Sequence, residues 1–274
     1  MNRAEELRAL AQRIADTLPV DEVVLTGGVS RGVADEWSDL ELLCLVPALP
    51  PLEQAETQAR VAGVEPTTRF GSAEITYVAG AHEGTTVELV WVEPATFDGF
   101  IDRAFAGELL DHSRLRGLEA LEHGVALRGG ERLAAWQRRL AEYPDRLREQ
   151  LILDAIDDWG GYPVAAYLRQ AHRDDRYSLV RVVLEVTDDV LRLLFALNRR
   201  WERSWKRLPD LLAGLEVAPP DAAERIASAL TTPEAREALR VTFELARDAV
   251  ALVGPEIETD RARAWLDEAV AELQ

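Results

Sequence analysis

The chain has 274 residues, of which 47% are hydrophobic and 29% charged, a balance typical of globular proteins that excludes disordered, collagen-like and low-complexity chains. No apolar run approaches the roughly 20 residues of a membrane-spanning helix, and the single cysteine, Cys44, excludes a disulfide framework or a cysteine-based zinc site. The formal net charge of −18 argues against a nucleic-acid partner and favours metal ions or cationic small molecules, although acidity can also serve solubility alone.

The first half of the sequence predicts alternating helices and strands. Apolar residues recur at helical spacing from Leu7 to Leu18, and Pro19 ends that helix, whose acid-rich pattern is unlike a secretory signal. Short β-branched or alternating runs bounded by glycine and proline predict the strands. The expected elements are a helix over 5–18, strands over 22–28 and 39–46, a helix over 52–62, and strands over 74–78 and 85–92.

Helical patterns begin again at Phe97 and dominate the rest of the sequence. Strands followed by a long series of helices predict an α+β domain over 1–130 and a helical bundle over 131–274. The helices expected in the bundle cover 131–141, 145–158, 162–172, 179–201, 222–230, 233–253 and 260–273.

The most informative stretch covers residues 26–46. Gly27 and Gly28 end the first strand, and glycines at a turn from a strand into a helix let backbone N–H groups approach phosphate oxygens closely. Ser30 can donate its hydroxyl to the same phosphates, and Arg31 follows it. The segment therefore predicts a nucleotide-binding turn formed by Gly27, Gly28, Ser30 and Arg31.

Three acidic residues are candidate metal ligands. Asp39 and Glu41 are separated by one strand residue, so their carboxylates point to the same side, as the sharing of hard divalent ions requires. Glu88 lies in an otherwise apolar strand, where an inward carboxylate is costly unless it binds a cation or a proton donor; the alternative is a position facing solvent. Divalent ions together with a triphosphate are the components of nucleotidyl transfer.

The combination of Gly27-Gly28, ten further residues, Asp39-Leu40-Glu41-Leu42 and a later strand-borne Glu88 resembles the nucleotidyltransferase-fold superfamily, the group of DNA polymerase beta. The resemblance covers about residues 20–93 and is greatest to bacterial aminoglycoside adenylyltransferases and, more loosely, to lincosamide nucleotidyltransferases. It implies a nucleotidyltransferase domain with a mixed β-sheet and flanking helices, followed by a helical bundle that covers substrate and nucleotide.

The resemblance also implies residue roles. The diglycine turn and Ser30 would hold the triphosphate, Asp39 and Glu41 would bind Mg²⁺, and Glu88 would be a third metal ligand or the general base for the attacking hydroxyl. Many members have serine in place of Gly28 and aspartate in place of Glu41, and the longer glutamate could shift the metal geometry. A catalytically inactive nucleotide-binding module is therefore an alternative.

Four further residues are candidates. Lys206 is the only lysine of the chain and could bind a phosphate from the helical part, or could be an ordinary surface residue. Asp154 and Asp158 lie one helical turn apart and could meet a cationic substrate or replace Glu88 as the general base, although helix surfaces often carry acids. Trp37, which precedes Ser38-Asp39, could flank the nucleotide.

These patterns together predict a cytoplasmic, Mg²⁺-dependent nucleotidyltransferase that transfers a nucleoside monophosphate, expected to be AMP from ATP, to a hydroxyl. The resemblance and the acidic surface favour an aminoglycoside-like small molecule as acceptor, as in antibiotic resistance. Transfer to protein or to tRNA, as in toxin-type members, is the alternative. No membrane partner is expected, and the sequence fixes neither the base of the nucleotide nor the oligomeric state.

Overall fold

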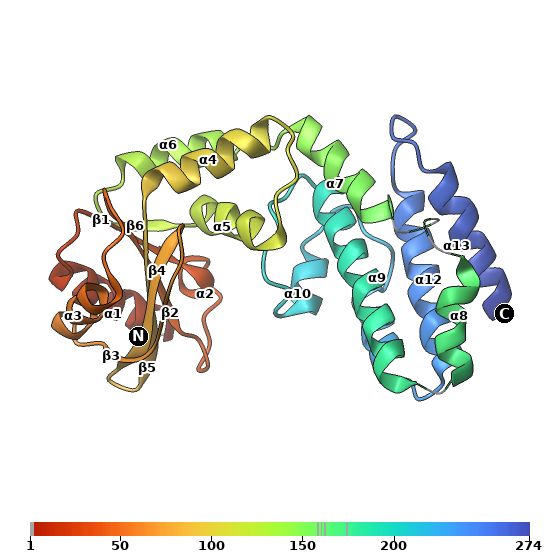
Figure 1. Cartoon of the computed structure of the whole chain (residues 1–274), viewed down its shortest axis with the longest axis horizontal. Helices are drawn as coiled ribbons and strands as arrows, with labels where there is room; N and C mark the ends of the chain where they lie inside the picture. The colour runs from red at the N-terminus through yellow and green to blue at the C-terminus, as the bar shows by residue number, and fades with distance from the viewer. Residues whose placement is uncertain (1–2, 158, 160, 162, 174) are drawn as a thin grey trace. The chain divides into compact units, whose positions relative to one another are not determined.

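The computed structural model describes residues 3–157, 159, 161, 163–173 and 175–274 (Figure 1). The chain divides into a sheet unit, Met1–Arg103 with Leu110–Glu142, and a helical unit, Ala104–Leu109 with Tyr143–Gln274. The expected α+β class, with a mixed sheet, flanking helices and C-terminal helices, is confirmed. The domain boundary expected at residue 130 stays a prediction.

Within the described residues, six strands form one sheet in the order β3-β4-β5-β2-β1-β6. β2 and β5 are parallel, whereas all other neighbours are antiparallel. The sequence patterns missed β3 and β6, because β3 is an edge strand with mostly exposed residues and β6 has only 4 residues. The strands are β1 (Glu22–Thr26), β2 (Leu40–Leu45), β3 (Glu65–Gly71), β4 (Ile75–His82), β5 (Thr85–Val92) and β6 (Val125–Arg128).

The core of the sheet unit lies between one face of the sheet and two helices, α1 (Arg3–Thr17) and α3 (Leu52–Val61). Each buried leucine or valine there contributes about 1.5–3 kcal/mol. Successive strand residues point to opposite faces, so Glu41 and Glu88, which lie between buried neighbours, project from the other face. The core-facing residues of β1, β2 and β5 are Val23, Leu25, Leu40, Leu42, Cys44, Val87, Leu89 and Trp91.

Three helices of the sheet unit are joined by side chains of α6. The indole of Trp136 donates to Asp98 of α4 at 2.7 Å. The Gln137 amide donates to the carbonyls of Leu121, Glu122 and Gly124 at and just beyond the end of α5, at 3.1, 3.2 and 2.9 Å. These helices are α4 (Pro94–Phe105), α5 (His112–Glu122) and α6 (Glu131–Leu140); α2 (Gly27–Ser30) is a single turn after β1.

The helical unit is built around α9 (Arg176–Leu197), most of whose apolar side chains are buried. No helix among the described residues has the length and apolar character needed to cross a membrane. The short α10 was not expected from the sequence. The other helices are α7 (Asp145–Asp157), α8 (Val164–Arg173), α10 (Leu208–Ala213), α11 (Ala222–Thr231), α12 (Ala235–Ala251) and α13 (Asp260–Leu273).

The central helix ends at Leu197, four residues before the end expected from its apolar pattern. Asn198 explains the difference. Its amide group donates to the carbonyls of Leu194 and Val217 at 2.7 Å, and its carbonyl accepts from the N–H groups of Glu216 and Val217 at 2.9 Å. The side chain thereby ties the helix end to a later loop, and the apolar residues beyond it pack outside the helix.

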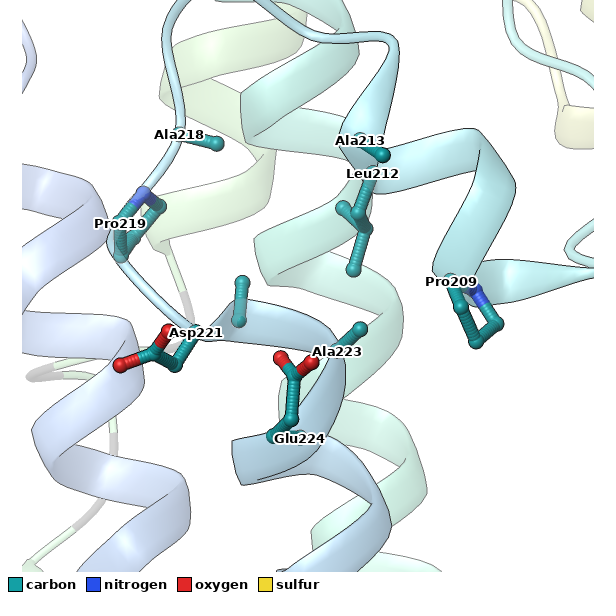
Figure 2. Close-up of a pocket in the computed structure, with 9 residues that line it drawn as sticks. Pro209, Leu212, Ala213, Ala218, Pro219, Asp221, Ala223 and Glu224 are labelled. Atoms are coloured by element: carbon teal, nitrogen blue, oxygen red, sulfur yellow. The ribbon is translucent and has the colours of Figure 1, made fainter.

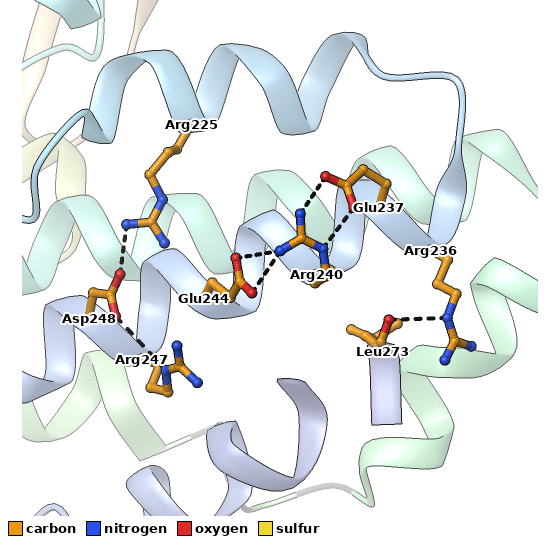
Figure 3. A network of polar contacts seen from close by, with 8 residues as sticks. All are labelled: Arg225, Arg236, Glu237, Arg240, Glu244, Arg247, Asp248 and Leu273. Atoms are coloured by element: carbon orange, nitrogen blue, oxygen red, sulfur yellow. Dashed lines mark hydrogen bonds and ion pairs between the residues drawn. The ribbon is translucent and has the colours of Figure 1, made fainter. Parts of the chain in front are cut away.

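Arginines of α11 and α12 form a polar network in the helical unit (Figure 3). Arg240 binds Glu244 at 2.7 Å and Glu237 on the same helix, and Arg225 of α11 binds Asp248 at 2.8 Å. Hydrogen bonds from Arg240 lower the pKa of Glu237 below its usual value. At pH values above 4.5, the usual pKa of this carboxyl group, the ionised Glu237 therefore stabilises the folded state. This stabilisation is lost as the pH falls through the lower pKa that Glu237 has in the folded chain.

We expect Arg240→Met to reduce the unfolding free energy at pH 7 and to have a smaller effect at pH 3, because a larger fraction of Glu237 is protonated at the lower pH. Arg236→Met is the matched control, because Arg236 of the same helix binds the carbonyl of Leu273, which does not titrate. Urea unfolding at the two pH values measures both variants. Equal losses from Arg240→Met at pH 7 and pH 3 would contradict the electrostatic role of the pair.

Candidate active site

Glu41 and Glu88 are neighbours on the sheet face opposite the core. The parallel strands β2 and β5 pair them directly, so their side chains leave the same face of strands that lie about 4.8 Å apart. Both residues are half-buried. Asp39, also half-buried, directly precedes β2 and lies two residues before Glu41. The fold thus brings acids from two distant parts of the sequence together.

Gly27 provides the space that the Glu41 carboxylate occupies. Thr26, the last residue of β1, pairs with Glu41, and the backbone then turns at Gly27 with a φ of 71°. A β-carbon at Gly27 would lie 2.5 Å from Oε1 of Glu41 and 2.6 Å from its Cδ. Glycine is therefore needed here both for the left-handed backbone and for the close approach of the carboxylate. The corresponding atom at Gly28 would meet only the Ser38 hydroxyl, at 4.0 Å.

Tyr77 of β4 is a site residue that the sequence interpretation missed. Burial, the negative charge of Glu88 and a hydrogen bond to its carboxylate raise the pKa of the Tyr77 phenol to about 12, and the charges of Asp39 and Glu41 act in the same direction. β4 pairs Ala79 with Glu88, so Tyr77 lies diagonally across from Glu88, at a distance that an aromatic side chain can span. The pKa of the Tyr77 phenol therefore depends on the charges of all three carboxylates.

The sequence held a signal for this contact. Glu83 and Gly84 join β4 to β5 and both have positive φ, 48° and 80°, as the tightest hairpin turns require. Such a two-residue turn fixes the pairing of His82 with Thr85. Counting back from it places Tyr77 on the same face as Glu88.

Ser30 and Arg31 have partners within the chain. The Ser30 hydroxyl donates to the Gly27 carbonyl at 3.0 Å. One nitrogen of the Arg31 guanidinium donates to both carboxylate oxygens of Glu119 on α5, at 3.0 and 3.2 Å, and Glu119 is only 4% exposed. The structure thus shows how Arg31 anchors the turn, while nucleotide binding by Ser30 and Arg31 stays a prediction.

Trp37 is exposed on the loop before β2. The Asp35 carboxylate accepts from the Ser38 hydroxyl at 2.9 Å and from the Trp37 N–H at 3.0 Å, and the Asp35 N–H donates back to Ser38 at 2.8 Å. These bonds define the backbone of the loop. The Trp37 side chain is 85% exposed, which is unusual for a residue of its size, and it lies two positions before Asp39.

The candidates in the helical unit have local surroundings of their own. Asp154 on α7 accepts from Arg192 of α9 at 2.7 Å, and Arg192 also pairs with Glu202, which is 1% exposed. Asp158 lies outside the described residues. Lys206 is exposed in the turn before α10. The roles expected for these residues stay predictions.

The helical unit also has a pocket of about 190 Å³ (Figure 2). Asp221 and Glu224 are its charged residues, and both are exposed. Among its lining residues, none is a nucleophile, a histidine or a cation, so we assign it no chemistry. The lining residues are Pro209, Leu212, Ala213, Ala218, Pro219, Asp221, Ala222, Ala223 and Glu224.

The donor set at the sheet suits a hard divalent cation, because carboxylate oxygens are the ligands that Mg²⁺ prefers. As the side chains are placed, no group of three or more His, Cys, Asp or Glu residues in the described part of the chain could hold a metal ion. Glu88 binds the Tyr77 hydroxyl and Glu41 lies against Gly27. The three acids are therefore of the residue type that such a cation prefers, but as placed they do not form a site for it.

Comparisons with known proteins add three findings. The profile of a family described as a domain of unknown function (DUF4037) matches residues 113–206. No curated protein matches the chain. The crystal structure of a nucleotidyltransferase-like protein from Exiguobacterium sibiricum 255-15 is similar over 99% of this chain and 80% of that one, with 12% sequence identity and a TM-score of 0.41. Function has to be inferred from the side chains of this chain.

Proposed function

We propose that this chain is a nucleotidyltransferase that uses a divalent cation to transfer a nucleoside monophosphate, AMP from ATP, to a hydroxyl of an acceptor, with release of pyrophosphate. The observation that carries the proposal is the direct pairing of Glu41 with Glu88 across parallel strands. Asp39 lies two residues from Glu41, and the diglycine turn closes around the Glu41 carboxylate. Acids in this arrangement beside a glycine turn suit a triphosphate and its metal ion.

The acids have two roles in the proposed reaction, metal binding and proton removal. Bound Mg²⁺ would stabilise the negative charge that develops on the transferred phosphoryl group. Asp39 and Glu41 hold the ion, and Glu88 joins them as a ligand or accepts the proton of the attacking hydroxyl. The Glu88 carboxylate already accepts a hydrogen bond from one hydroxyl, that of Tyr77. Removal of the proton by a positioned base contributes roughly 10²–10⁴-fold to the rate.

The diglycine turn is the proposed seat of the triphosphate. The side of Gly27 is filled by the Glu41 carboxylate, whereas Gly28 has open space beside it. Ser30 and Arg31 contribute only if phosphate oxygens replace their present partners, the Gly27 carbonyl and Glu119.

The acceptor is proposed to be a cationic small molecule of the aminoglycoside type. The first 124 residues carry 22 acidic and 9 basic side chains, and an acidic surface raises the local concentration of cations. The test is transfer of label from ATP labelled on its α-phosphate, in the presence of Mg²⁺, to aminoglycosides, tRNA and cell protein in separate reactions. We expect label on the small molecule. Label on tRNA or protein alone would overturn the acceptor, and no transfer to any of them would overturn the activity.

Trp37 is proposed to stack on the base of the nucleotide. Stacking on an aromatic side chain contributes about 1–3 kcal/mol per base, so Trp37→Ala should raise KM for ATP by roughly tenfold, with kcat little changed. Trp37→Phe keeps an aromatic platform and should remain close to the unmodified protein. Steady-state kinetics at saturating acceptor measures all three, and an unchanged KM in Trp37→Ala would remove Trp37 from the nucleotide site.

A further inference from the structure

The single turn of α2 depends on neighbouring helices for its position. A helix of four residues has too few internal hydrogen bonds to fix its own backbone. The hydroxyl of Thr26, the residue before it, donates to the Glu41 carbonyl at 3.3 Å and does not cap the turn. Support comes instead from α1, because Arg8 donates to the carbonyls of Val29 and Ser30 at 3.3 and 3.4 Å.

The second support is the ion pair between Arg31 and Glu119, which joins the end of α2 to α5. Nη1 of Arg31 donates to both Glu119 oxygens at 3.0 and 3.2 Å. Nε of Arg31 is buried and has no hydrogen-bond partner among the described residues, so the Glu119 carboxylate compensates the charge of the desolvated guanidinium. His123 lies farther away, with its Nε2 atom 3.9 Å from the same carboxylate, beyond hydrogen-bond distance.

The backbone around Arg31 closes the turn that its side chain anchors. The Arg31 N–H donates to the Gly27 carbonyl at 3.4 Å, and the Val33 N–H donates to the Gly28 carbonyl at 3.0 Å. Gly32 lies between the two donors with a φ of 74°, in the left-handed region. Because these bonds join residues close in sequence, a displacement of Arg31 also displaces the two glycines.

We propose that Glu119 is a positioning residue of the nucleotide site, which fixes the diglycine turn by holding Arg31. Arg31 acts through its backbone and stays on Glu119 when the nucleotide binds. A turn already held in its binding conformation loses less conformational freedom when it takes up a triphosphate. The inference rests on the proposed function, which places the triphosphate at this turn, and it involves none of the acids on β2 and β5.

Hydrogen exchange followed by mass spectrometry measures the turn itself, without nucleotide or metal. Glu119→Gln removes the charge and nearly keeps the size of the side chain, whereas Arg31→Met removes the same pair from the other side and leaves His123 untouched. We expect faster exchange in peptides that cover residues 27–33 in both variants, with exchange in the strands of the sheet unit unchanged. Arg31→Lys keeps a cation for Glu119 and should exchange more slowly in this segment than Arg31→Met.

Glu74→Gln is the matched control. Glu74, just before β4, accepts from Arg114 of α5 at 2.8 Å, so this variant removes an ion pair of the same helix that does not involve the turn. Its exchange over residues 27–33 and its affinity for ATP should equal those of the unmodified protein.

Calorimetric titration with ATP in the presence of Mg²⁺ measures the consequence for nucleotide binding. We expect Glu119→Gln and Arg31→Met each to bind ATP roughly tenfold more weakly, and the double variant to bind no more weakly than either, because all three lack one and the same interaction. An arginine that left Glu119 to bind phosphate would give the opposite sign for Glu119→Gln. Removal of the competing carboxylate would then tighten ATP binding.

Failure of the positioning role and failure of the proposed function give different results. Unchanged exchange over residues 27–33 in Glu119→Gln and Arg31→Met, or exchange that rises equally throughout the sheet unit, would overturn the positioning role. An ATP affinity that is unchanged or higher in Glu119→Gln would overturn it as well. Absence of ATP binding by the unmodified protein would overturn the proposed nucleotide site, and with it the role of Glu119 in nucleotide binding.

Discussion

Asp39→Asn is expected to abolish nucleotidyl transfer to within the detection limit, a loss of roughly a thousandfold or more, which corresponds to about 4 kcal/mol of transition-state stabilisation. Asparagine has nearly the same size as aspartate but carries no charge. The substitution therefore removes one carboxylate from the proposed metal site without opening a cavity at the start of β2. Transfer from labelled ATP and Mn²⁺ titration measure activity and metal affinity in the same preparation.

The control for this prediction is Glu53→Gln. Glu53 is an exposed acid of α3, the helix that covers the opposite, core face of the sheet. The substitution Glu53→Gln changes the net charge of the sheet unit by the same amount as Asp39→Asn. Loss of transfer in Asp39→Asn with full activity in Glu53→Gln supports a ligand role, whereas full activity in Asp39→Asn would exclude Asp39 from the metal site.

Gly27→Ala is expected to have the second large effect, on both stability and metal binding. The backbone at Gly27 has a φ of 71°, and an L-residue in this region costs about 1–2 kcal/mol. The new methyl group would also lie 2.5 Å from Glu41 Oε1, so the carboxylate has to move away from the place it now occupies. We expect a lower unfolding free energy together with a roughly tenfold or greater loss of Mn²⁺ affinity.

Gly84→Ala separates the two causes. Gly84 in the turn between β4 and β5 has a φ of 80°, and a β-carbon there would meet no atom within 4 Å. Urea unfolding should therefore show a comparable loss of stability for Gly84→Ala, while its Mn²⁺ affinity stays unchanged. If Gly27→Ala bound Mn²⁺ as tightly as Gly84→Ala does, the close contact between Gly27 and Glu41 would have no part in forming the site.

Periodicity was sufficient for the elements that bury one face. The four expected strands are present in the sheet unit. Each contains a buried apolar residue of the core face (Val23, Leu42, Val78 and Leu89), within an alternating or β-branched run that the sequence shows. Periodicity did not predict β3. This strand pairs with β4 at an exposed edge of the sheet, so most of its side chains are exposed and form no apolar pattern. Periodicity did not predict the end of α9 either, because the side chain of Asn198 bonds to residues 216 and 217, which are remote in sequence.

The placement of the candidate site residues on the sheet was predictable where spacing along one strand decides the direction of a side chain, and not where pairing between strands decides it. The shared face of Asp39 and Glu41 follows from their separation by one residue. The placement of Glu88 beside Glu41 needs the parallel register of β2 and β5, which the sequence alone leaves open. The hydrogen bond of Tyr77 to Glu88 needs in addition the register of β4 and β5.

The arginine beside the diglycine turn shows a similar limit. Its position after Ser30 suggested a phosphate contact, and its identity alone could not reveal a competing carboxylate more than eighty residues later in the chain. Glu119 is buried on α5, where an unpaired charge is costly, so the pair with Arg31 satisfies both residues. A cation next to a glycine turn is therefore not by itself a sign of phosphate binding.

The most direct measurement is an anomalous difference map from crystals grown with Mn²⁺ and a non-hydrolysable ATP analogue. The proposed function predicts a Mn²⁺ peak in contact with the carboxylates of Asp39 and Glu41, with Glu88 turned toward it and the triphosphate on the open side of Gly28. Mn²⁺ bound only elsewhere, or a Glu88 carboxylate directed away from the other two acids in the presence of both ligands, would contradict it.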